Sequence, residues 1–283
     1  MAGLAGLAAY AGSCARSGFA LAGCRLGQSR SCTMVTLDNL TVSYRQHPAL
    51  HHVSGQFAAG SLTAVVGPNG SGKTTLLKSV MGLLPTDGGQ LAVATQRARI
   101  AYLPQLSEID RSFPLRVAEC VQLGCWATHG AWGGLRTAQL ARVQRALQTV
   151  GLDDFDQRPI STLSSGQLQR VLFARLLVQD AQLILLDEPF NAVDSKTTAA
   201  LLSILQLWHT QQRTVIAVVH DDAQVRQYFP QTLLLAREVV AWGETAHVMT
   251  EPHLQQARAM AEAWNESAPL CDVDAPGAHA VVV

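Results

Sequence analysis

The chain has 283 residues with 21 basic and 21 acidic side chains, so its formal net charge is zero. A neutral chain gives no bulk electrostatic reason to expect binding to nucleic acid or to an anionic membrane surface. Hydrophobic residues make up 48% of the chain, yet no uncharged apolar run reaches the length of about 18 residues that suggests a membrane span. We therefore expect no bilayer crossing, and a role at a membrane would need a partner.

Residues 1–33 differ in composition from the rest of the chain. They are rich in Ala, Gly and Ser and contain no acidic residue. Leu21–Cys24 resembles a lipoprotein cleavage box, but Arg16 interrupts the apolar stretch and no basic residue precedes it, which makes a poor signal peptide. We expect an unstructured extension or an over-long start, with the working protein beginning near Met34.

The next stretch predicts strands. Apolar residues roughly alternate from Val35 to Tyr44, as in a strand with one buried face. A turn-rich stretch is expected from Arg45 to Leu50, followed by further strand-like sequence up to Val66.

A phosphate-binding loop follows. Residues 67–75 fit the pattern G-x-x-x-x-G-K-[ST] at every fixed position, with a strand-like run at 62–66 before it and a helical pattern at 76–81 after it. Backbone N–H groups of such a loop and the following helix N-terminus point at phosphate oxygens. Lys73 can reach the β- and γ-phosphates, and the Thr74 hydroxyl can ligate Mg²⁺. The predicted phosphate-binding residues are Gly67, Pro68, Asn69, Gly70, Ser71, Gly72, Lys73, Thr74 and Thr75.

Short strands are expected near Leu91–Val93 and Arg99–Leu103. Residues from about 106 to 162 then read as helices and loops. The clearest helix spans Thr137 to Val150, where apolar residues recur at helical spacing.

A pair of acidic residues ends a second strand. Residues 183–186 form a continuous apolar run, the pattern of a buried parallel strand, and Asp187 and Glu188 follow directly. Asp187 is placed to hold Mg²⁺ through water. Glu188 is placed to orient a water molecule and accept its proton. The simpler reading, two acids ending a strand at the surface, fits less well beside a phosphate loop.

One further helix has a distinctive start. In Leu163–Gln167, Ser164 stands at an N-cap position and Gly166 leaves backbone N–H groups open, an arrangement that binds anions. Taken alone, the segment fits an ordinary capped helix equally well. Thr214–Val219 is a second buried strand. Strands that alternate with helices predict an α/β sheet, and 251–283 is expected to hold a C-terminal helix and a loose tail.

Together these motifs resemble the ATP-binding cassette family, the motor subunits of ABC transporters, over about residues 35–250. Leu163–Gln167 is similar to the family signature LSGGQ, with Ser165 in place of the first glycine. The resemblance implies an α/β fold with a phosphate-loop NTPase (RecA-like) core, an antiparallel β subdomain and a helical signature subdomain at about 106–162, within an ATPase domain at 34–250.

The resemblance also implies roles for single residues. Gln105 of the Q-loop would sense Mg²⁺ and the attacking water, so that Thr74, Gln105 and Asp187 form the magnesium set. His220 would contact the γ-phosphate as a catalytic residue beside Glu188 and Gln105. The remaining implied residues are Tyr44, stacked on adenine, Asp194 of the D-loop, and Ser164, Ser165, Gly166 and Gln167, acting in trans on the ATP of a second subunit.

Partners follow from the same resemblance. It implies a head-to-tail homodimer with ATP bound at each interface, integral membrane permease subunits, a solute-binding protein, and a position on the cytoplasmic face of the cell membrane. Coupling to the permease would involve residues 106–134. Exposure of Trp126 or Trp132 there would mark a docking patch, whereas burial would place them in the core.

The cargo is indicated only by similarity. Residues 186–198, with Phe190 after the proline, are similar to the zinc/manganese importer subfamily. An iron-siderophore or haem importer is the nearest rival. A soluble ABC ATPase acting on ribosomes or DNA is disfavoured by a single cassette without net charge, so no nucleic acid is expected. A phosphate-loop kinase is disfavoured by the signature segment and His220.

Overall fold

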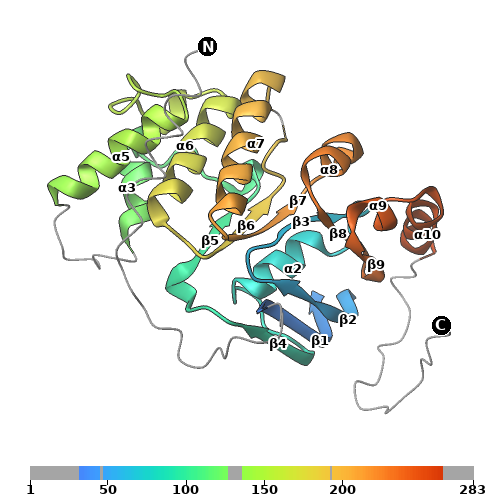
Figure 1. Cartoon of the computed structure of the whole chain (residues 1–283). Coiled ribbons are helices and arrows are strands. Elements are labelled where there is room, and N and C mark those ends of the chain that lie inside the picture. Colours follow the sequence, from blue (N-terminus) through green and yellow to red (C-terminus); the bar gives the residue numbers. More distant parts are fainter. Residues whose placement is uncertain (1–31, 45–46, 127–135, 192, 264–283) are drawn as a thin grey trace. The chain divides into compact units, whose positions relative to one another are not determined.

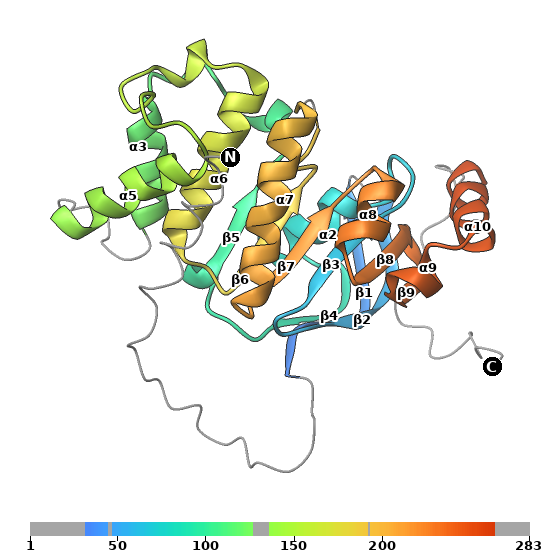
Figure 2. The same ribbon diagram turned by 45° about the horizontal axis from the view of Figure 1, so that its top comes forward.

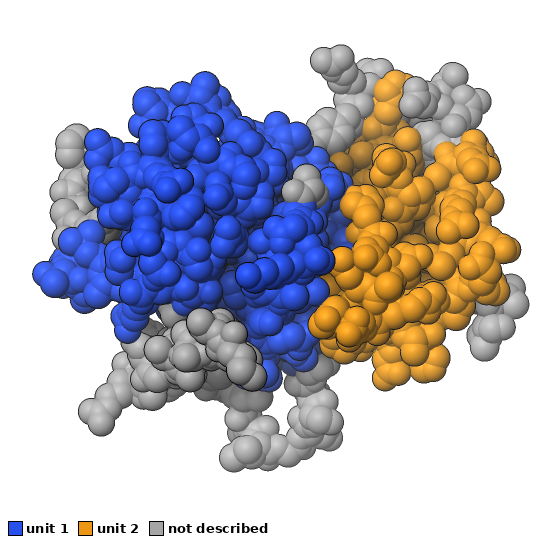
Figure 3. Space-filling view, turned by 90° about the horizontal axis from the view of Figure 1, so that it is seen from above, with its two compact units in different colours: residues 1–34, 58–62, 95–219 blue, residues 35–57, 63–94, 220–283 orange. Residues whose placement is uncertain are grey.

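The computed structural model describes residues 32–44, 47–126, 136–191 and 193–263. Predictions for residues 1–31, for Trp132 and for the tail from 264 onward lie outside this range. The chain forms two compact units, coloured separately in Figure 3. Unit 1 is built mainly from residues 95–219, and unit 2 from residues 35–57, 63–94 and 220 onward.

Unit 1 contains three parallel strands in the order β5 (Ile100–Leu103), β6 (Leu183–Asp187) and β7 (Thr214–Val218). Leu185 of β6 lies in register with Tyr102 on one side and with Ile216 on the other. Every residue of β6 and β7 is buried. Strands covered on both faces need continuous apolar runs rather than alternation, which is why both strands could be predicted from the sequence.

The helices of unit 1 enclose an apolar core. Figures 1 and 2 both show α3, α5 and α6 side by side. Between α6 and α7, the rings of Phe173 and Trp208 stack with their centroids 6.0 Å apart. The helices are α3 (Val117–Gln122), α5 (Thr137–Thr149), α6 (Ser165–Gln179) and α7 (Ser195–Thr210), with short 3₁₀ turns η1 (Arg97–Arg99), η2 (Leu106–Glu108), η3 (Leu123–Cys125) and η4 (Ile160–Thr162).

Unit 2 contains a three-stranded sheet in the order β2 (His47–Ala58), β1 (Thr33–Tyr44), β4 (Gly88–Val93), in which β1 and β4 are antiparallel. It also contains β3 (Leu62–Val66), which pairs in parallel with β8 (Gln231–Ala236), and β9 (Glu238–Glu244), antiparallel to β8. Its helices are α2 (Lys73–Val80), α8 (Asp222–Tyr228), α9 (Thr245–Val248) and α10 (Glu251–Glu262). In the described residues, no helix has the length and apolar character that a membrane span needs.

The expected turn-rich stretch from Arg45 to Leu50 is wrong from His47 onward, because strand β2 begins at His47. Burial in β2 does not alternate: the buried apolar residues are Leu50, Val53 and Phe57. The backbone has positive φ at His52 and at Gly55, which breaks the two-residue period. Such irregular burial removes the alternation that would mark the first residues of the strand, so the sequence predicted the later part of β2 but not its start.

The other predicted elements are confirmed: strands near 35–44, 91–93, 99–103, 183–186 and 214–219, and the helix from Thr137. Within α5, Val143 and Leu147 are buried as the spacing predicts. Leu140 shares that spacing but is 47% exposed.

Candidate functional site

The phosphate loop connects β3 to α2 and can be built only with glycine at two positions. Gly67 has φ 148° and Gly72 has φ 92°. A Cβ on Gly67 would lie 1.9 Å from the carbonyl oxygen of Leu235, and one on Gly72 would lie 2.3 Å from that of Ala49. Both distances are far below van der Waals contact, so any side chain would push the loop away from β8 or β2.

Lys73 is held inside this loop. Its side chain is buried, and its Nζ donates to the carbonyl oxygens of Gly67 at 2.9 Å and Pro68 at 2.7 Å, and to Ser71 Oγ at 3.4 Å. Gly72 precedes the helix without a side-chain cap. No side chain therefore caps the first N–H groups of α2. These N–H groups lie beside the buried ammonium group of Lys73, and the combination favours binding of an anion.

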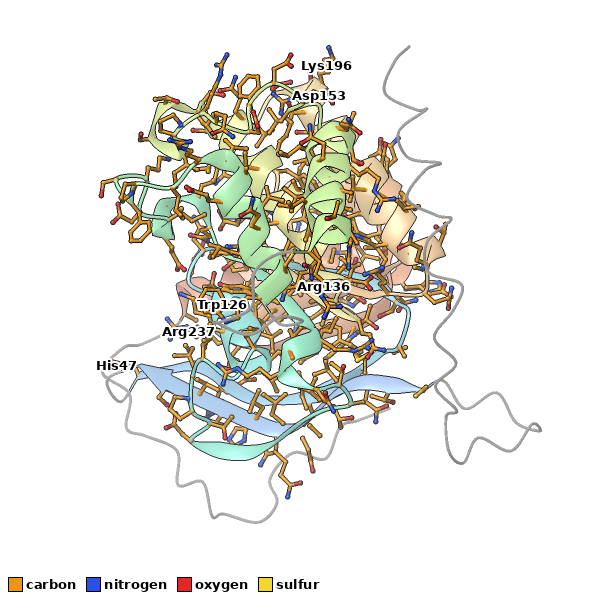
Figure 4. All side chains as sticks on the ribbon, turned by 90° about the vertical axis from the view of Figure 1, so that its left-hand side faces the viewer. His47, Trp126, Arg136, Asp153, Lys196 and Arg237 are labelled. Atoms are coloured by element: carbon orange, nitrogen blue, oxygen red, sulfur yellow. The ribbon has the colours of Figure 1, made fainter. Side chains whose placement is uncertain are left out.

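The turn between β8 and β9 supports the phosphate loop, a feature the sequence did not reveal. Arg237, labelled in Figure 4, has φ 65° and donates its N–H to the carbonyl oxygen of Ser71 at 2.9 Å. Its guanidinium donates to the carbonyl oxygen of Pro48 at 2.9 Å, and its own carbonyl accepts from the N–H of His51. The His51 ring lies 2.8 Å from Glu238 Oε1. This turn thus joins the loop to β2.

The two predicted carboxylates end β6 in unit 1. Asp187 is fully buried, and Glu188 follows with φ 51°, an uncommon value for a residue other than glycine. Glu188 Oε1 accepts from Gln105 Nε2 at 2.8 Å, and Oε2 accepts from Asn191 Nδ2 at 3.0 Å. The structure therefore brings two of the predicted site residues, Gln105 and Glu188, into hydrogen-bond contact. Asn191 as second partner was not foreseen.

The signature helix α6 begins as the sequence predicts. Ser164 is the N-cap: its Oγ accepts from the N–H of Gln167 at 3.2 Å, and its own N–H donates to Gln167 Oε1 at 3.0 Å. This reciprocal pair is a capping box. The hydroxyl of Ser165, the departure from the family signature, accepts from Arg111 Nη2 at 3.2 Å. Arg111 is a second residue that sequence patterns did not single out.

Asp194, predicted to belong to a D-loop, lies beside Gly166 of the predicted signature segment within unit 1. A Cβ on Gly166 would lie 3.6 Å from Asp194 Oδ2. Asp194 is also the N-cap of α7 and accepts from the N–H and the hydroxyl of Thr197 at 2.9 and 2.8 Å. These bonds, the backbone one first, hold the pKa of the Asp194 carboxyl below its usual value. Buried Gln169 of α6 donates to the carbonyl oxygen of Pro189 at 2.7 Å, which ties the helix to the segment after Glu188.

The remaining predicted residues lie in unit 2. His220 is exposed and follows the buried Val219. Asp221 next to it caps α8 by accepting from two backbone N–H groups. Thr74 is half-buried in the first turn of α2. Tyr44 ends β1, and its side chain lies outside the described part of the chain.

A loop that requires glycine at two positions and holds a buried lysine, between a buried strand and a helix, defines a phosphate-loop nucleotide-binding protein. The family model described as ABC transporter matches residues 50–191. The chain belongs to this family, whose ATP-binding subunits hydrolyse ATP to power transport.

Curated relatives carry more specific names. The zinc transport system ATP-binding protein TroB of Treponema pallidum is 40% identical over 234 residues, covering 81% of this chain and 88% of that protein. The manganese transport system ATP-binding protein MntB of Listeria monocytogenes is 40% identical over 228 residues, covering 78% of this chain and 94% of that protein. MntB of Bacillus subtilis is 38% identical over 227 residues.

Solved structures agree on the fold. An inward-facing ABC transporter assigned to the metal-chelate type has 27% sequence identity and a TM-score of 0.72, with 80% of this chain and 89% of that chain covered. An ATP-binding cassette in a dimeric post-hydrolysis state with ADP and Pi has 26% identity and a TM-score of 0.67, with 75% and 99% covered. The α/β fold with its phosphate-loop core is therefore that of an ABC ATPase.

Proposed function

We propose that the chain is the ATP-hydrolysing motor subunit of an ABC importer for divalent metal ions, zinc or manganese. Hydrolysis is supported above all by Glu188, whose two carboxylate oxygens are each oriented by an amide donor at the end of a buried strand. The metal cargo is supported by relatives at 36–40% identity that are named zinc, manganese or metal transport ATP-binding proteins. Their length is largely covered by this chain.

ATP is the proposed nucleotide. The backbone of residues 67–75 would bind the phosphates, with Lys73 on the β- and γ-phosphates and Tyr44 stacked on adenine. Mg²⁺ would be held by Thr74, Gln105 and Asp187. These residues offer hydroxyl, amide and carboxylate oxygens, the hard donors that Mg²⁺ prefers. The ion would neutralise charge on the phosphates.

Glu188 is the proposed base that orients the attacking water and accepts its proton. The donors on both oxygens fix the plane of the carboxylate, and Gln105 and Asn191 are therefore proposed to act on hydrolysis through Glu188. His220 would contact the γ-phosphate and stabilise its charge.

The working assembly is proposed to be a head-to-tail homodimer. Each γ-phosphate would meet the signature helix of the other subunit at Ser164, Ser165, Gly166 and Gln167, with Asp194 at the crossing point. The N-terminus of α6, capped by Ser164 and Gln167, would present the positive end of its dipole to this phosphate. ATP would then stabilise the closed dimer through contacts absent from the open one.

Permease subunits and a solute-binding protein would complete the importer on the cytoplasmic face of the membrane. In the segment expected to dock the permease, the side chains of Phe113 and Trp126 are each 58% exposed; Trp126 is labelled in Figure 4. Val117 and Val121 of the same segment are buried. Exposed aromatic residues favour an interface, so we propose Phe113 and Trp126 as docking residues.

Hydrolysis is tested with Glu188→Gln. The variant should bind ATP with Mg²⁺, lose turnover by roughly 10²- to 10⁴-fold as a missing general base predicts, and accumulate as a dimer in size-exclusion chromatography with ATP. Glu262→Gln, an exposed residue at the end of α10, is the matched control and should behave as wild type. Turnover by Glu188→Gln at the wild-type rate would refute the assigned role.

Cargo is tested by uptake of zinc and manganese in a strain lacking the protein, complemented with wild type or Glu188→Gln. A deficit in one metal that only wild type restores identifies that metal. Normal uptake of both would refute the metal assignment, and iron-siderophore uptake would be measured next, since one structural neighbour is of the metal-chelate type. Co-purification with ribosomes rather than with a membrane protein would overturn the transport role.

A further inference from the structure

The serine that departs from the family signature makes a contact that glycine could not. Ser165 is the first residue of α6, and its hydroxyl accepts a hydrogen bond from Arg111 Nη2 at 3.2 Å. Both side chains are half-buried, and the residues are 54 positions apart in the chain. The bond therefore joins the segment after Gln105 to the start of the signature helix, within unit 1.

The segment that carries Arg111 is held in a defined turn. Asp110 Oδ1 accepts from the N–H of Ser112 at 2.9 Å and from its hydroxyl at 2.6 Å. The hydroxyl and the N–H of Ser112 lower the pKa of the Asp110 carboxyl, as hydrogen bonds to the charged form do. Phe113 follows directly and is 58% exposed. Arg111 therefore lies inside this turn, and the exposed ring of Phe113 follows it directly in the chain.

The other end of the contact is also fixed. Ser164 and Gln167 cap each other at the start of α6, so the first turn of the helix is held by two side-chain hydrogen bonds. A guanidinium beside a helix N-terminus lies against the positive end of the helix dipole and is favourable only with a compensating interaction. Here the Ser165 hydroxyl is the acceptor that holds Arg111 in place.

We propose that Arg111 is a positioning residue for the signature helix, linking the turn that carries Phe113 to the N-terminus of α6 through the Ser165 hydroxyl. This inference rests on the proposed ATPase function. Arg111 acts on the partner's ATP through the signature helix. Its loss therefore lowers turnover by the dimer and leaves the binding of ATP to the phosphate loop of its own chain unchanged.

The test compares Arg111→Ala, Arg111→Lys, Ser165→Gly, Ser165→Ala and the double variant Arg111→Ala/Ser165→Ala. Arg116→Ala is the matched control, because Arg116 lies in the same segment and its guanidinium donates to Gln157 instead, at 2.6 Å. For each variant we would measure kcat and KM for ATP with Mg²⁺, binding of a fluorescent ATP analogue, and the melting temperature.

The expected result is a fall in kcat of about tenfold in Arg111→Ala, the effect of one lost hydrogen bond to a charged donor. KM and analogue binding stay at wild-type values. Arg111→Lys restores most of the turnover because it keeps the charge and a donor. The Arg111→Ala/Ser165→Ala double variant is no worse than Ser165→Ala alone, since Arg111 acts only through the Ser165 hydroxyl.

Additive losses in the double variant would overturn the proposal, as would wild-type kcat in Arg111→Ala or an equal loss in Arg116→Ala. A loss that follows the melting temperature across the set would show a structural role alone and would also overturn it. Failure of the proposed function is recognised by a different result. If wild type does not hydrolyse ATP, the proposed function and the role of Arg111 are both refuted. If wild type is active and Glu188→Gln is not, only the role of Arg111 is in question.

Discussion

Replacing Lys73 by Met removes the ammonium group at the centre of the phosphate loop. The side chain is buried, and its Nζ donates to the carbonyl oxygens of Gly67 and Pro68. Methionine has a similar length but offers no donor and no charge. Both carbonyls lose their lysine donor, so the nucleotide-free protein should melt at a lower temperature. The informative quantity is therefore the shift that nucleotide produces, not the melting temperature itself.

The size of that shift follows from linkage. One charge-assisted hydrogen bond contributes about 1.5–3 kcal/mol, so its loss weakens nucleotide binding roughly 10- to 150-fold. At about 100 times the dissociation constant, nucleotide stabilises wild type by about 2.7 kcal/mol; after a 100-fold loss of affinity, the same concentration gives about 0.4 kcal/mol. In melting temperature, the shift falls from about 5–11 °C to about 1–2 °C.

The assay is thermal unfolding with and without a non-hydrolysable ATP analogue and Mg²⁺. Lys78→Met is the matched control, because Lys78 lies on the same helix but outside the loop. It should keep the full shift. A wild-type shift in Lys73→Met would refute the reasoning, since it would mean that the loop binds phosphate without the lysine.

Three further predictions follow from the described contacts. Gln105→Ala should lower kcat about tenfold by releasing one oxygen of Glu188, and in a Glu188→Gln background it should change steady-state turnover no further. Trp208→Ala should lower the free energy of unfolding by about 3–5 kcal/mol in guanidinium titration, because a fully buried ring leaves a cavity. The pKa of Asp194 is lowered in the folded state by Thr197, so its stabilisation is present above the unfolded pKa and is lost as pH falls through the folded one. On acidification below about pH 4, the melting temperature of Asp194→Asn should therefore fall less than that of wild type. Equal acid sensitivity of the two proteins would contradict this.

Sequence alone predicts those parts of the site that depend on neighbours in the chain. The phosphate loop needs glycines and a lysine at fixed spacing, and Ser164 and Gln167 form a cap three residues apart. Asp187 and Glu188 were predicted because a fully buried strand gives an unbroken apolar run before them. In each case the local sequence carries the whole physical requirement.

Long-range supports of the site could not be predicted in this way. Arg237 takes φ 65° and holds Ser71 and Pro48, which lie far from it in the chain. Nothing in an Ala-Arg-Glu tripeptide indicates a left-handed residue, since arginine is not favoured there. Arg111 is similar, because its partner Ser165 is 54 residues away. Such contacts depend on tertiary packing, which leaves no periodic pattern.

The cap of α6 explains why serine suits position 164. Asp and Asn cap helices as well as Ser does, because the N-cap position requires only a hydrogen-bond acceptor. A phosphate oxygen is itself an acceptor and requires a hydrogen-bond donor. The hydroxyl of Ser164 accepts a hydrogen bond from the N–H of Gln167 and can still donate its own proton to a second acceptor. In the proposed dimer, an aspartate there would preserve the helix cap but repel the nucleotide, so closure on ATP should be lost while the stability of the protein is kept.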